Sequence, residues 1–441
     1  MCTNPLHLQR PNLGFSFDVP CNSCLECQSA SQDSWLFRLS CDLDALYKRK
    51  GFGVFLTFTY SDVFLPHSDF GLRGELQSCF NSDDTTKFLN KIKVYMNRTY
   101  GKGAYRYFVC SEYGKFTKRP HLHALFMLES YVDYFAFCEK CRQYWTYGFT
   151  FPRQCNGRYY DNNMHLTTPL LHNPQQCCKY VIKYITKDMF FYELPLIQRY
   201  IDFRKDLPSN IRSHYNKYLP HHFQSKGIGS SFFSNCDTPT SLLKCVTDGV
   251  VNPATLKVVQ LPRYYVEHFA FDHSVQERLG NKIVVRTLKD AYRSVVRQVF
   301  VNSFTSRIKR IDNFLLNINP FILKRYDYQV SDFDLVLQAR AIGSTSLVLR
   351  QFYNNLSPKT RWYFNRFYSG LTLDNVVNLK LDMLSLDFSC FPDDYTSYPL
   401  VDDFLRMFYR IDNDTRSSLL LSRYNEYLIK KKLKLLQKNC L

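Results

Sequence analysis

The first 190 residues alternate between two hydrophobic patterns. Apolar side chains recur at helical spacing in 32–50, while 54–60 and 105–112 are dense in β-branched and aromatic residues, which are typical of strands. The same two patterns predict further helices over 88–96, over 131–144 and from residue 174, and further strands over 121–126 and 147–151. Since strands and helices are mixed, we expect an α+β fold in which a mainly antiparallel sheet has helices packed on one face.

Two histidines interrupt one of the predicted strands. Side chains alternate between the two faces of a strand, so His121 and His123 project from one side while Leu122 and Ala124 take the other. The strand follows 105–112 closely enough to form a β-hairpin with a long basic loop. Histidines in this arrangement can chelate a metal, but a pair on a strand is more often a hydrogen-bonded core or surface feature, so both interpretations stay open.

The helix predicted from residue 174 has a polar face of unusual composition. The Asn-Pro pair at 173–174 favours a helix start. At about 100° per residue, four side chains fall opposite the apolar stripe: Tyr180, Lys183, Tyr184 and Lys187. Positive charge favours a phenolate and stabilises a phosphate under attack, so this face suits a covalent nucleophile. A basic helix that only contacts DNA is the alternative.

Composition narrows the class of partner. The 441 residues carry 57 Lys+Arg against 39 Asp+Glu, a formal net charge of +18, together with 32 Tyr and 37 Phe. Cations neutralise phosphates and aromatic rings stack on unpaired bases, so a single-stranded nucleic acid is favoured over a merely cationic surface. We find no signal-peptide pattern and no apolar run of about 18 residues, so we expect no membrane partner, a cytoplasmic protein and reduced thiols.

Several of the 16 cysteines stand close together near the N-terminus. A Cys-x2-Cys-x2-Cys run with one further thiolate could complete a tetrahedral zinc site: Cys2, Cys21, Cys24 and Cys27, with Cys41 as a substitute for Cys2. Free thiols are the alternative, and an iron–sulfur cluster is less favoured because the chain has no other redox signature. The Cys-x2-Cys pair at 138–141 fits one helical turn, and we expect it to serve packing.

These motifs together resemble a known family. The histidine pair followed some 60 residues later by Tyr-x3-Tyr resembles the HUH superfamily of rolling-circle endonucleases, and more closely the replication initiators of microviruses, with the cysteine run similar to the gokushovirus branch. The resemblance rests on 21–27, 55–60, 111–125, 180–187 and 225–229. The tyrosines follow the histidines, which separates the chain from conjugative relaxases, and there are two of them, which separates it from single-tyrosine initiators.

The resemblance implies a mechanism. His121 and His123, with Glu112 as third ligand, would bind one Mg²⁺ or Mn²⁺ ion. Tyr180 or Tyr184 would then attack the scissile phosphate, leaving a 5′-phosphotyrosine and a free 3′-hydroxyl, and the second tyrosine would serve repeated rounds and circle closure. Three cations in the hairpin loop are expected to contact phosphates: Lys115, Lys118 and Arg119.

The implied partners follow from this function. The substrate would be single-stranded DNA at the replication origin of a phage, in the cytoplasm of its bacterial host. The chain has no Gly-x4-Gly-Lys-[Ser/Thr] phosphate loop, so unwinding and synthesis would need a host helicase and a host DNA polymerase. The competing hypothesis is a non-catalytic, zinc-containing protein that coats single-stranded DNA, although such a protein has no need of two phenols one helical turn apart.

We expect three regions along the chain. These are a Cys-rich segment (1–31), an HUH-type nickase domain (32–230) and a mostly helical, basic region (231–441) for DNA or partner binding. Within the last region, 283–310 and 345–368 are rich in Arg, Tyr and Phe, and we expect both to be helical.

Overall fold

The structure is a computed structural model. It describes residues 6–10, 15–19, 25–72, 76–114, 119–161, 163–171, 173, 194–203, 207–278, 281–302, 349, 353, 356 and 358–382. The chain divides into two compact units. We call Ser31–Asp237 with Asp248–Pro262 the sheet unit, and Met1–Ala30, Thr238–Thr247 and Arg263–Leu441 the terminal unit. This grouping does not test independent folding, so the three-region division stays a prediction.

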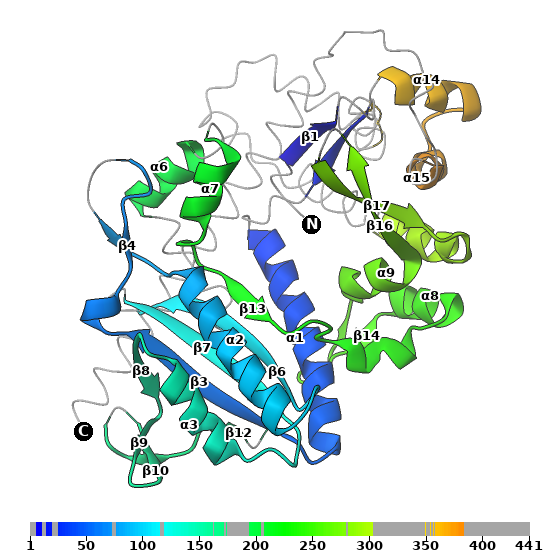
Figure 1. Ribbon diagram of the computed structural model, residues 1–441. Helices are drawn as coiled ribbons and strands as arrows, with labels where there is room; N and C mark the ends of the chain where they lie inside the picture. The colour runs from blue at the N-terminus through cyan, green and yellow to red at the C-terminus, as the bar shows by residue number, and fades with distance from the viewer. Residues whose placement is uncertain are drawn as a thin grey trace, which may run out of the picture. The chain divides into compact units, whose positions relative to one another are not determined.

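A six-stranded antiparallel sheet forms the centre of the sheet unit. Its strand order is β12-β3-β7-β6-β13, and β8 also pairs with β3 (Figure 1). The strands are β3 (Phe52–Tyr60), β6 (Tyr105–Tyr113), β7 (Pro120–Leu128), β8 (Gly148–Phe151), β12 (Leu170–Leu171) and β13 (His222–Gln224). The hairpin β6–β7 and the strands β3 and β8 were predicted. The histidine strand β7 is therefore central, with a neighbour on each side.

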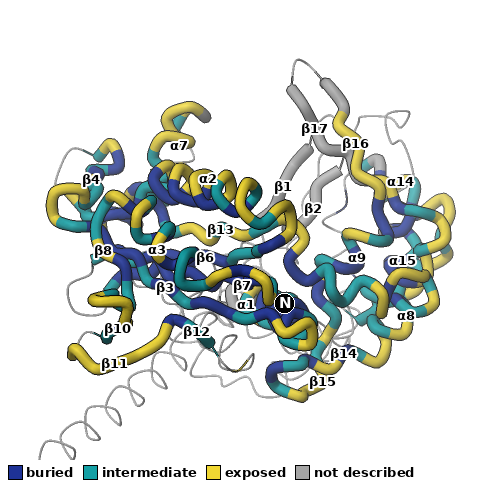
Figure 2. Tube along the Cα trace, turned by 60° about the horizontal axis from the view of Figure 1, so that its bottom comes forward, coloured by how far each residue is buried: buried dark blue, intermediate teal, exposed yellow. Residues whose placement is uncertain are grey.

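Helices cover both faces of this sheet. Apolar residues of α2 (Ser82–Thr99) and α3 (Tyr134–Tyr144) form one core with β7 residues such as Leu122 and Phe126. On the other face, α1 (Leu25–Lys48) packs through Trp35, Leu39 and Leu43 in a second core. Figure 2 shows the resulting buried strands β3, β6 and β7. The expectation of helices on one face is wrong, because the stripe of α1 matches apolar side chains on the face opposite α2.

The helix ends follow ordinary capping chemistry. Asn81 accepts a hydrogen bond from the Asp83 amide at the start of α2, and Asp133 accepts from the amides of Phe135 and Ala136 at the start of α3. These caps set the starts of both helices, which the sequence predicted within a few residues. The Cys-x2-Cys pair of α3 is fully buried in the core, which confirms its packing role.

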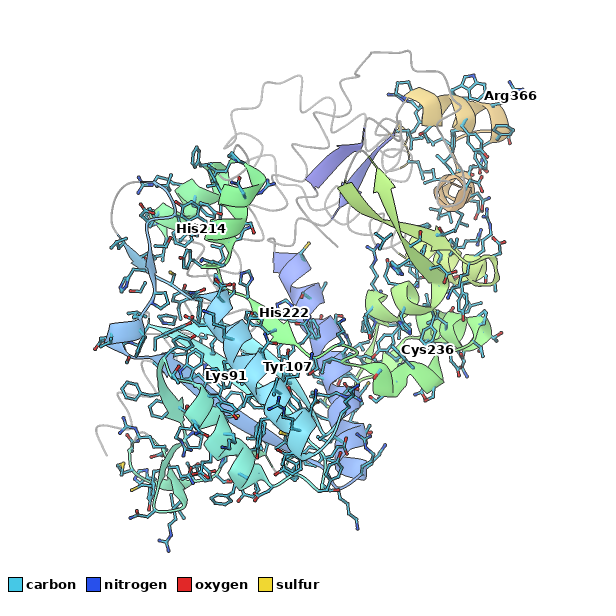
Figure 3. The ribbon with its side chains drawn as sticks, viewed as in Figure 1. Lys91, Tyr107, His214, His222, Cys236 and Arg366 are labelled. Atoms are coloured by element: carbon cyan, nitrogen blue, oxygen red, sulfur yellow. The ribbon has the colours of Figure 1, made fainter. Side chains whose placement is uncertain are left out.

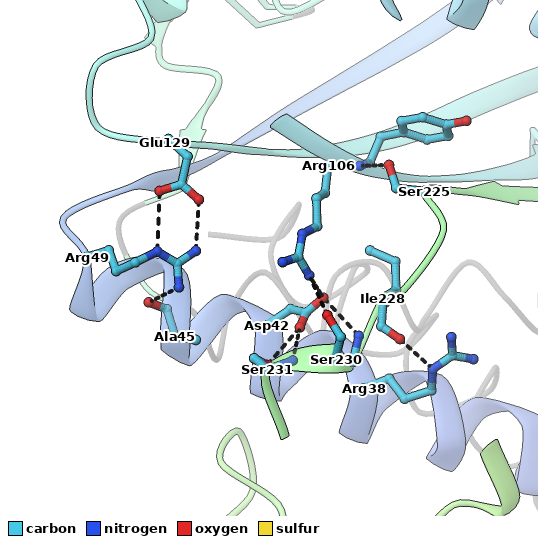
Figure 4. Close-up of polar contacts among 12 residues, drawn as sticks. Arg38, Asp42, Ala45, Arg49, Arg106, Glu129, Ser225, Ile228, Ser230 and Ser231 are labelled. Carbon is cyan, nitrogen blue, oxygen red and sulfur yellow. Dashed lines mark hydrogen bonds and ion pairs between the residues drawn. The ribbon is translucent and has the colours of Figure 1, made fainter. Parts of the chain in front are cut away.

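A buried carboxylate holds α1 to the loop 225–231. Asp42 of α1 accepts hydrogen bonds from the Gly229 amide (2.8 Å) and from the Ser231 amide and hydroxyl (3.2 and 2.7 Å). Arg106 of β6 completes the set with an ion pair at 2.7 Å (Figure 4). Burying a charge is costly unless it is paired and hydrogen-bonded, and here both conditions hold. This clamp fixes α1 against the sheet.

Shorter elements complete the sheet unit. They are η2 (Asp62–Phe64), β4 (His67–Ser68), β5 (Gln77–Ser78), β9 (Arg153–Cys155), β10 (Arg158–Tyr160), β11 (Leu166–Thr167), α6 (Pro195–Phe203), α7 (Ser209–Asn216), η3 (Ser230–Asn235), β14 (Val250–Val251) and β15 (Val258–Val259). Among the described residues, no helix is long and apolar enough to cross a membrane.

The terminal unit contains hairpins as well as helices. Its elements are β1 (Leu6–Arg10), β2 (Phe15–Val19), α8 (Pro239–Asp248), α9 (Arg263–Ala270), β16 (Phe271–Arg278), β17 (Asn281–Leu288), η4 (Asp290–Tyr292), α14 (Pro358–Phe367) and α15 (Leu373–Asp382). The helix expected from residue 283 is wrong over 283–288, which pairs along β16. Ile283, Val284 and Val285 are β-branched, and this favours a strand. Residues 293–302 and α14 are helical, as expected.

Candidate active site

The pairing of three strands brings the predicted ligands together. On β7, His121 and His123 share one face, while Leu122 and Ala124 lie in the core on the other, as the alternation predicted. His121 lies opposite Glu112 of β6 in the register. Directly paired residues in an antiparallel sheet have side chains on the same face, so the three side chains form one cluster. We call His121, His123 and Glu112 the histidine cluster.

Two threonines of β3 hold the imidazole rings. The Thr57 hydroxyl lies 3.0 Å from Nδ1 of His123, and the Thr59 hydroxyl lies 2.9 Å from Nδ1 of His121. Each threonine is the direct register partner of the histidine that it contacts. Fixing Nδ1 orients each ring and makes Nε2 the nitrogen available for a metal, as second-shell partners do in metal sites.

His123 is the most constrained member of the cluster. Its Nε2 lies 2.5 Å from Oε2 of Glu112, and the two residues are only 8% and 7% exposed. On its flank, the ring stacks on Phe55, with centroids 5.7 Å apart and planes inclined by 18°. The imidazole and the carboxylate are therefore held together on a partly apolar floor.

Gly114 closes the cluster at the end of β6. A Cβ built at this position would lie 2.8 Å from Nε2 of His121. Any larger residue would push the ring away, so this glycine gives the imidazole its position. The sequence motif containing Ser111 to Gly114 thus has a physical explanation at both Glu112 and Gly114.

The donor chemistry fits a hard catalytic cation. Two imidazoles and one carboxylate are ligands that Mn²⁺ accepts, and Mg²⁺ accepts the carboxylate readily. No group of three or more His, Cys, Asp or Glu side chains in the described ranges is arranged so that it could hold a metal ion as it stands. The short contact between His123 and Glu112 accounts for this, because the two would-be ligand atoms hydrogen-bond each other.

Arg119 anchors the hairpin loop. Its guanidinium donates to the Tyr60 carbonyl at 2.8 Å and forms an ion pair with Asp62. Arg119 thereby joins the start of β7 to the end of β3, a structural role that the sequence did not suggest. The other two predicted phosphate contacts, Lys115 and Lys118, lie outside the described residues.

A second polar group supports the end of β3 from the core side. The hydroxyl of the buried Tyr60 donates to Asp84 of α2 at 3.4 Å. Burial, followed by the Asp84 charge, raises the pKa of Tyr60, and burial also raises the pKa of Asp84. A phenol with a raised pKa stays protonated and remains a donor, which suits a structural tie.

His222 extends the polar row across the sheet. It lies on β13 opposite Cys110, and Cys110 in turn lies opposite His123. Figure 3 labels it on this strand. Its ring stacks on Phe108, with centroids 5.9 Å apart. Desolvation, then the neighbouring His221 and Arg38, lower the pKa of His222, so it carries no charge toward the cluster at neutral pH.

The predicted nucleophiles cannot be placed against this cluster. Tyr180, Lys183, Tyr184 and Lys187 lie in 174–193, outside the described residues. Their role stays a prediction.

The cysteine site is described only in part. Cys27 is half-buried on α1, whereas Cys2, Cys21 and Cys24 lie outside the described residues. Cys41 is buried on the same helix about four turns further on. Two side chains that far apart on one helix cannot bind one ion, so Cys41 is wrong as a ligand beside Cys27.

Residues 53–189 match the family model of the replication-associated protein ORF2. The match begins in β3 and includes the whole histidine cluster. This part of the chain is a replication-associated domain of the ORF2 family. Comparisons with curated proteins and with solved structures gave no match. The ORF2 match is consistent with the microvirus-type initiator expected from the sequence, but it does not test the subtype or the number of tyrosines.

Sequence reasoning missed three residues of this ORF2-family domain that shape the site. Thr57, Thr59 and Gly114 lie within motifs that carried the family resemblance, but they were given no role there. A strand-pairing argument could have found the threonines, because both fall at alternating positions of a strand beside the histidines. The register that joins them is long-range, and local patterns do not determine it.

Proposed function

We propose that this chain is a rolling-circle replication initiator that nicks and rejoins single-stranded DNA at a phage origin. The observation that carries the proposal is the histidine cluster, whose rings are oriented by Thr57 and Thr59, inside a replication-associated domain. A protein that only coats DNA has no use for two imidazoles and a carboxylate oriented at this cost in burial. The proposal therefore goes beyond binding to chemistry.

His121, His123 and Glu112 would hold the catalytic Mg²⁺ or Mn²⁺ ion. When bound, such an ion polarises a phosphate oxygen and offsets the charge that develops on it. Thr57 and Thr59 keep the ring nitrogens in position, and Phe55 excludes water from one side of His123. Binding would displace the proton shared by His123 and Glu112, which couples metal affinity to pH.

The covalent step falls to Tyr180 or Tyr184. The phenol oxygen forms a bond to phosphorus and loses its proton, while the bond from phosphorus to the 3′-oxygen breaks and that oxygen takes up a proton. Lys183 and Lys187 would favour the phenolate. The 5′-phosphotyrosine keeps the energy of the phosphodiester, so the reverse attack rejoins the strand without a nucleotide.

The product requires host partners. The free 3′-hydroxyl would be extended by a host DNA polymerase, with a host helicase for unwinding, in the bacterial cytoplasm. Lys115 and Lys118 would contact the DNA backbone near the cluster, and Cys2, Cys21, Cys24 and Cys27 would hold a structural zinc ion. The zinc proposal is independent of the nicking proposal.

A covalent-adduct assay tests the function. A labelled single-stranded oligonucleotide carrying the origin is incubated with the protein and Mn²⁺ and resolved on a denaturing gel. We expect an adduct that disappears with His123→Ala and with the double change Tyr180→Phe and Tyr184→Phe. Intact DNA binding without any adduct would instead favour the non-catalytic, zinc-containing DNA-binding protein.

A further inference from the structure

Two phenylalanines of β8 belong to neither core of the sheet unit. Phe149 is 56% exposed and Phe151 is half-buried, and neither packs in the cluster around α1 or in the cluster around α2 and α3. Thr150, between them, points to the core side and is buried. Exposed aromatic rings at alternating strand positions indicate a binding surface when they lie beside a site.

The register places both rings beside the histidine cluster. Phe149 pairs with Thr59, which pairs with His121, and Phe151 pairs with Thr57, which pairs with His123. Paired side chains share a face, so each ring continues a row that ends on a histidine. With strands about 4.8 Å apart, the phenylalanines stand two strands, or roughly 10 Å, from the histidines.

Close packing keeps β8 in this register. A Cβ at Gly148 would overlap the carbonyl oxygen of Thr59, so only glycine lets β8 approach β3 here. The position of Phe149 relative to the cluster is therefore fixed by the backbone and not by a flexible loop.

A cation accompanies the rings. The exposed Arg153, just after β8, lies over the Phe151 ring at 5.4 Å from its centroid. An aromatic face combined with a guanidinium matches a nucleotide, because the ring stacks on the base and the cation contacts the phosphate. In a duplex the base faces are already stacked on one another, so this surface suits unpaired bases.

We propose that Phe149, Phe151 and Arg153 form a stacking platform for unpaired bases next to the scissile phosphate of single-stranded DNA. The location beside the cleaved bond rests on the proposed function, whereas the stacking itself does not. The platform orients the strand across the sheet, so that the phosphate between the bound bases and the next nucleotides reaches the histidine cluster. It makes the site selective for single strands.

Fluorescence anisotropy with the full chain tests the stacking. The probes are a fluorescein-labelled oligothymidylate and an abasic strand of equal length, in EDTA so that no cleavage occurs. We expect Phe149→Ala to weaken oligothymidylate binding about tenfold and to leave abasic binding nearly unchanged, because only the first strand has bases to stack. Phe149→Trp should retain the affinity of the native chain, which also controls for misfolding.

A matched control separates stacking from loss of exposed aromatic surface. Tyr131 is 62% exposed in the turn that follows β7, at the end of that strand far from His121, so Tyr131→Ala should change neither affinity. Equal weakening of both strands by Phe149→Ala, or no weakening of either, would overturn the platform. The adduct assay reports separately: a native chain that distinguishes the two probes through Phe149 but forms no adduct would refute the nicking function and not the platform.

Discussion

The two sides of β7 have the same backbone and opposite duties. Leu122, Ala124 and Phe126 face α2 and α3 and are almost completely buried in an apolar core. His121 and His123, at the intervening positions, face polar partners from the strands on either side. One side therefore stabilises the fold through burial alone, and the other depends on directed hydrogen bonds.

The difference shows how the sheet can support a buried polar cluster. The core side fixes the register, because a slip by one residue would move every apolar side chain to the wrong face. With the register fixed, Thr57 and Glu112 fall beside His123 without any further device. Changes on the two sides of β7 should thus separate stability from activity.

The largest separation is expected between His123→Ala and Phe126→Ala. Removing the imidazole should lower adduct formation by more than about a hundredfold with little change in the unfolding midpoint, since it takes away a ligand and not core volume. Phe126→Ala should instead reduce the free energy of unfolding by about 3–5 kcal/mol. Denaturant titration and the adduct gel measure both; a His123→Ala protein as unstable as Phe126→Ala would contradict the division of duties.

The threonines should give the next largest effect. Thr57→Val and Thr59→Val preserve side-chain shape but remove the hydroxyl that contacts a ring nitrogen, so metal affinity should fall about 10–100-fold. Thr→Ser at the same positions should restore most of it.

Thr150 offers the matched control for these variants. Its hydroxyl is buried on the core side of β8 and has no hydrogen-bond partner among the described residues. Thr150→Val should therefore leave Mn²⁺ affinity unchanged and keep or slightly raise stability. An equal loss of Mn²⁺ affinity in all three valine variants would show that the threonines of β3 have no special role.

The clamp on α1 should affect stability without touching the cluster. Asp42→Asn leaves Arg106 without its counter-charge and weakens the bonds to Gly229 and Ser231, so we expect a loss of about 1–3 kcal/mol in the free energy of unfolding. Asp44→Asn, which removes an exposed pair with Lys48, should cost less than about 0.5 kcal/mol. Urea unfolding compares the two, and similar losses would argue against the clamp.

The smallest expected effect is a pH dependence at His222. Its pKa lies below the ordinary 6.5 in the folded chain, so the unfolded chain binds more protons as the pH falls through 6.5, and stability falls with it. His222→Gln should lose less stability than the native chain between neutral and mildly acidic pH, by under about 1 kcal/mol because solvent screens the charge. Unfolding midpoints at the two pH values test this; identical losses would contradict it.

The sequence predicted local features well and pairings across the chain poorly. Alternation along β7 identified the shared face of His121 and His123, and the hairpin placed Glu112 beside them. The threonine contacts, the platform of β8 and the bond from Arg119 to Asp62 all depend on register between distant segments, which hydrophobic period does not encode. The error at 283–288 has another cause, because composition was given more weight than three consecutive β-branched residues.

Mn²⁺ binding followed by electron paramagnetic resonance tests the central claim most directly. The free ion gives a sharp signal that is lost on binding, so the readout needs neither DNA nor the tyrosines. We predict that the native chain binds one ion at the histidine cluster and that Glu112→Gln and His123→Ala each weaken this binding strongly while the chain stays folded. Binding that is equally tight in these variants, or no binding by the native chain, would contradict the account.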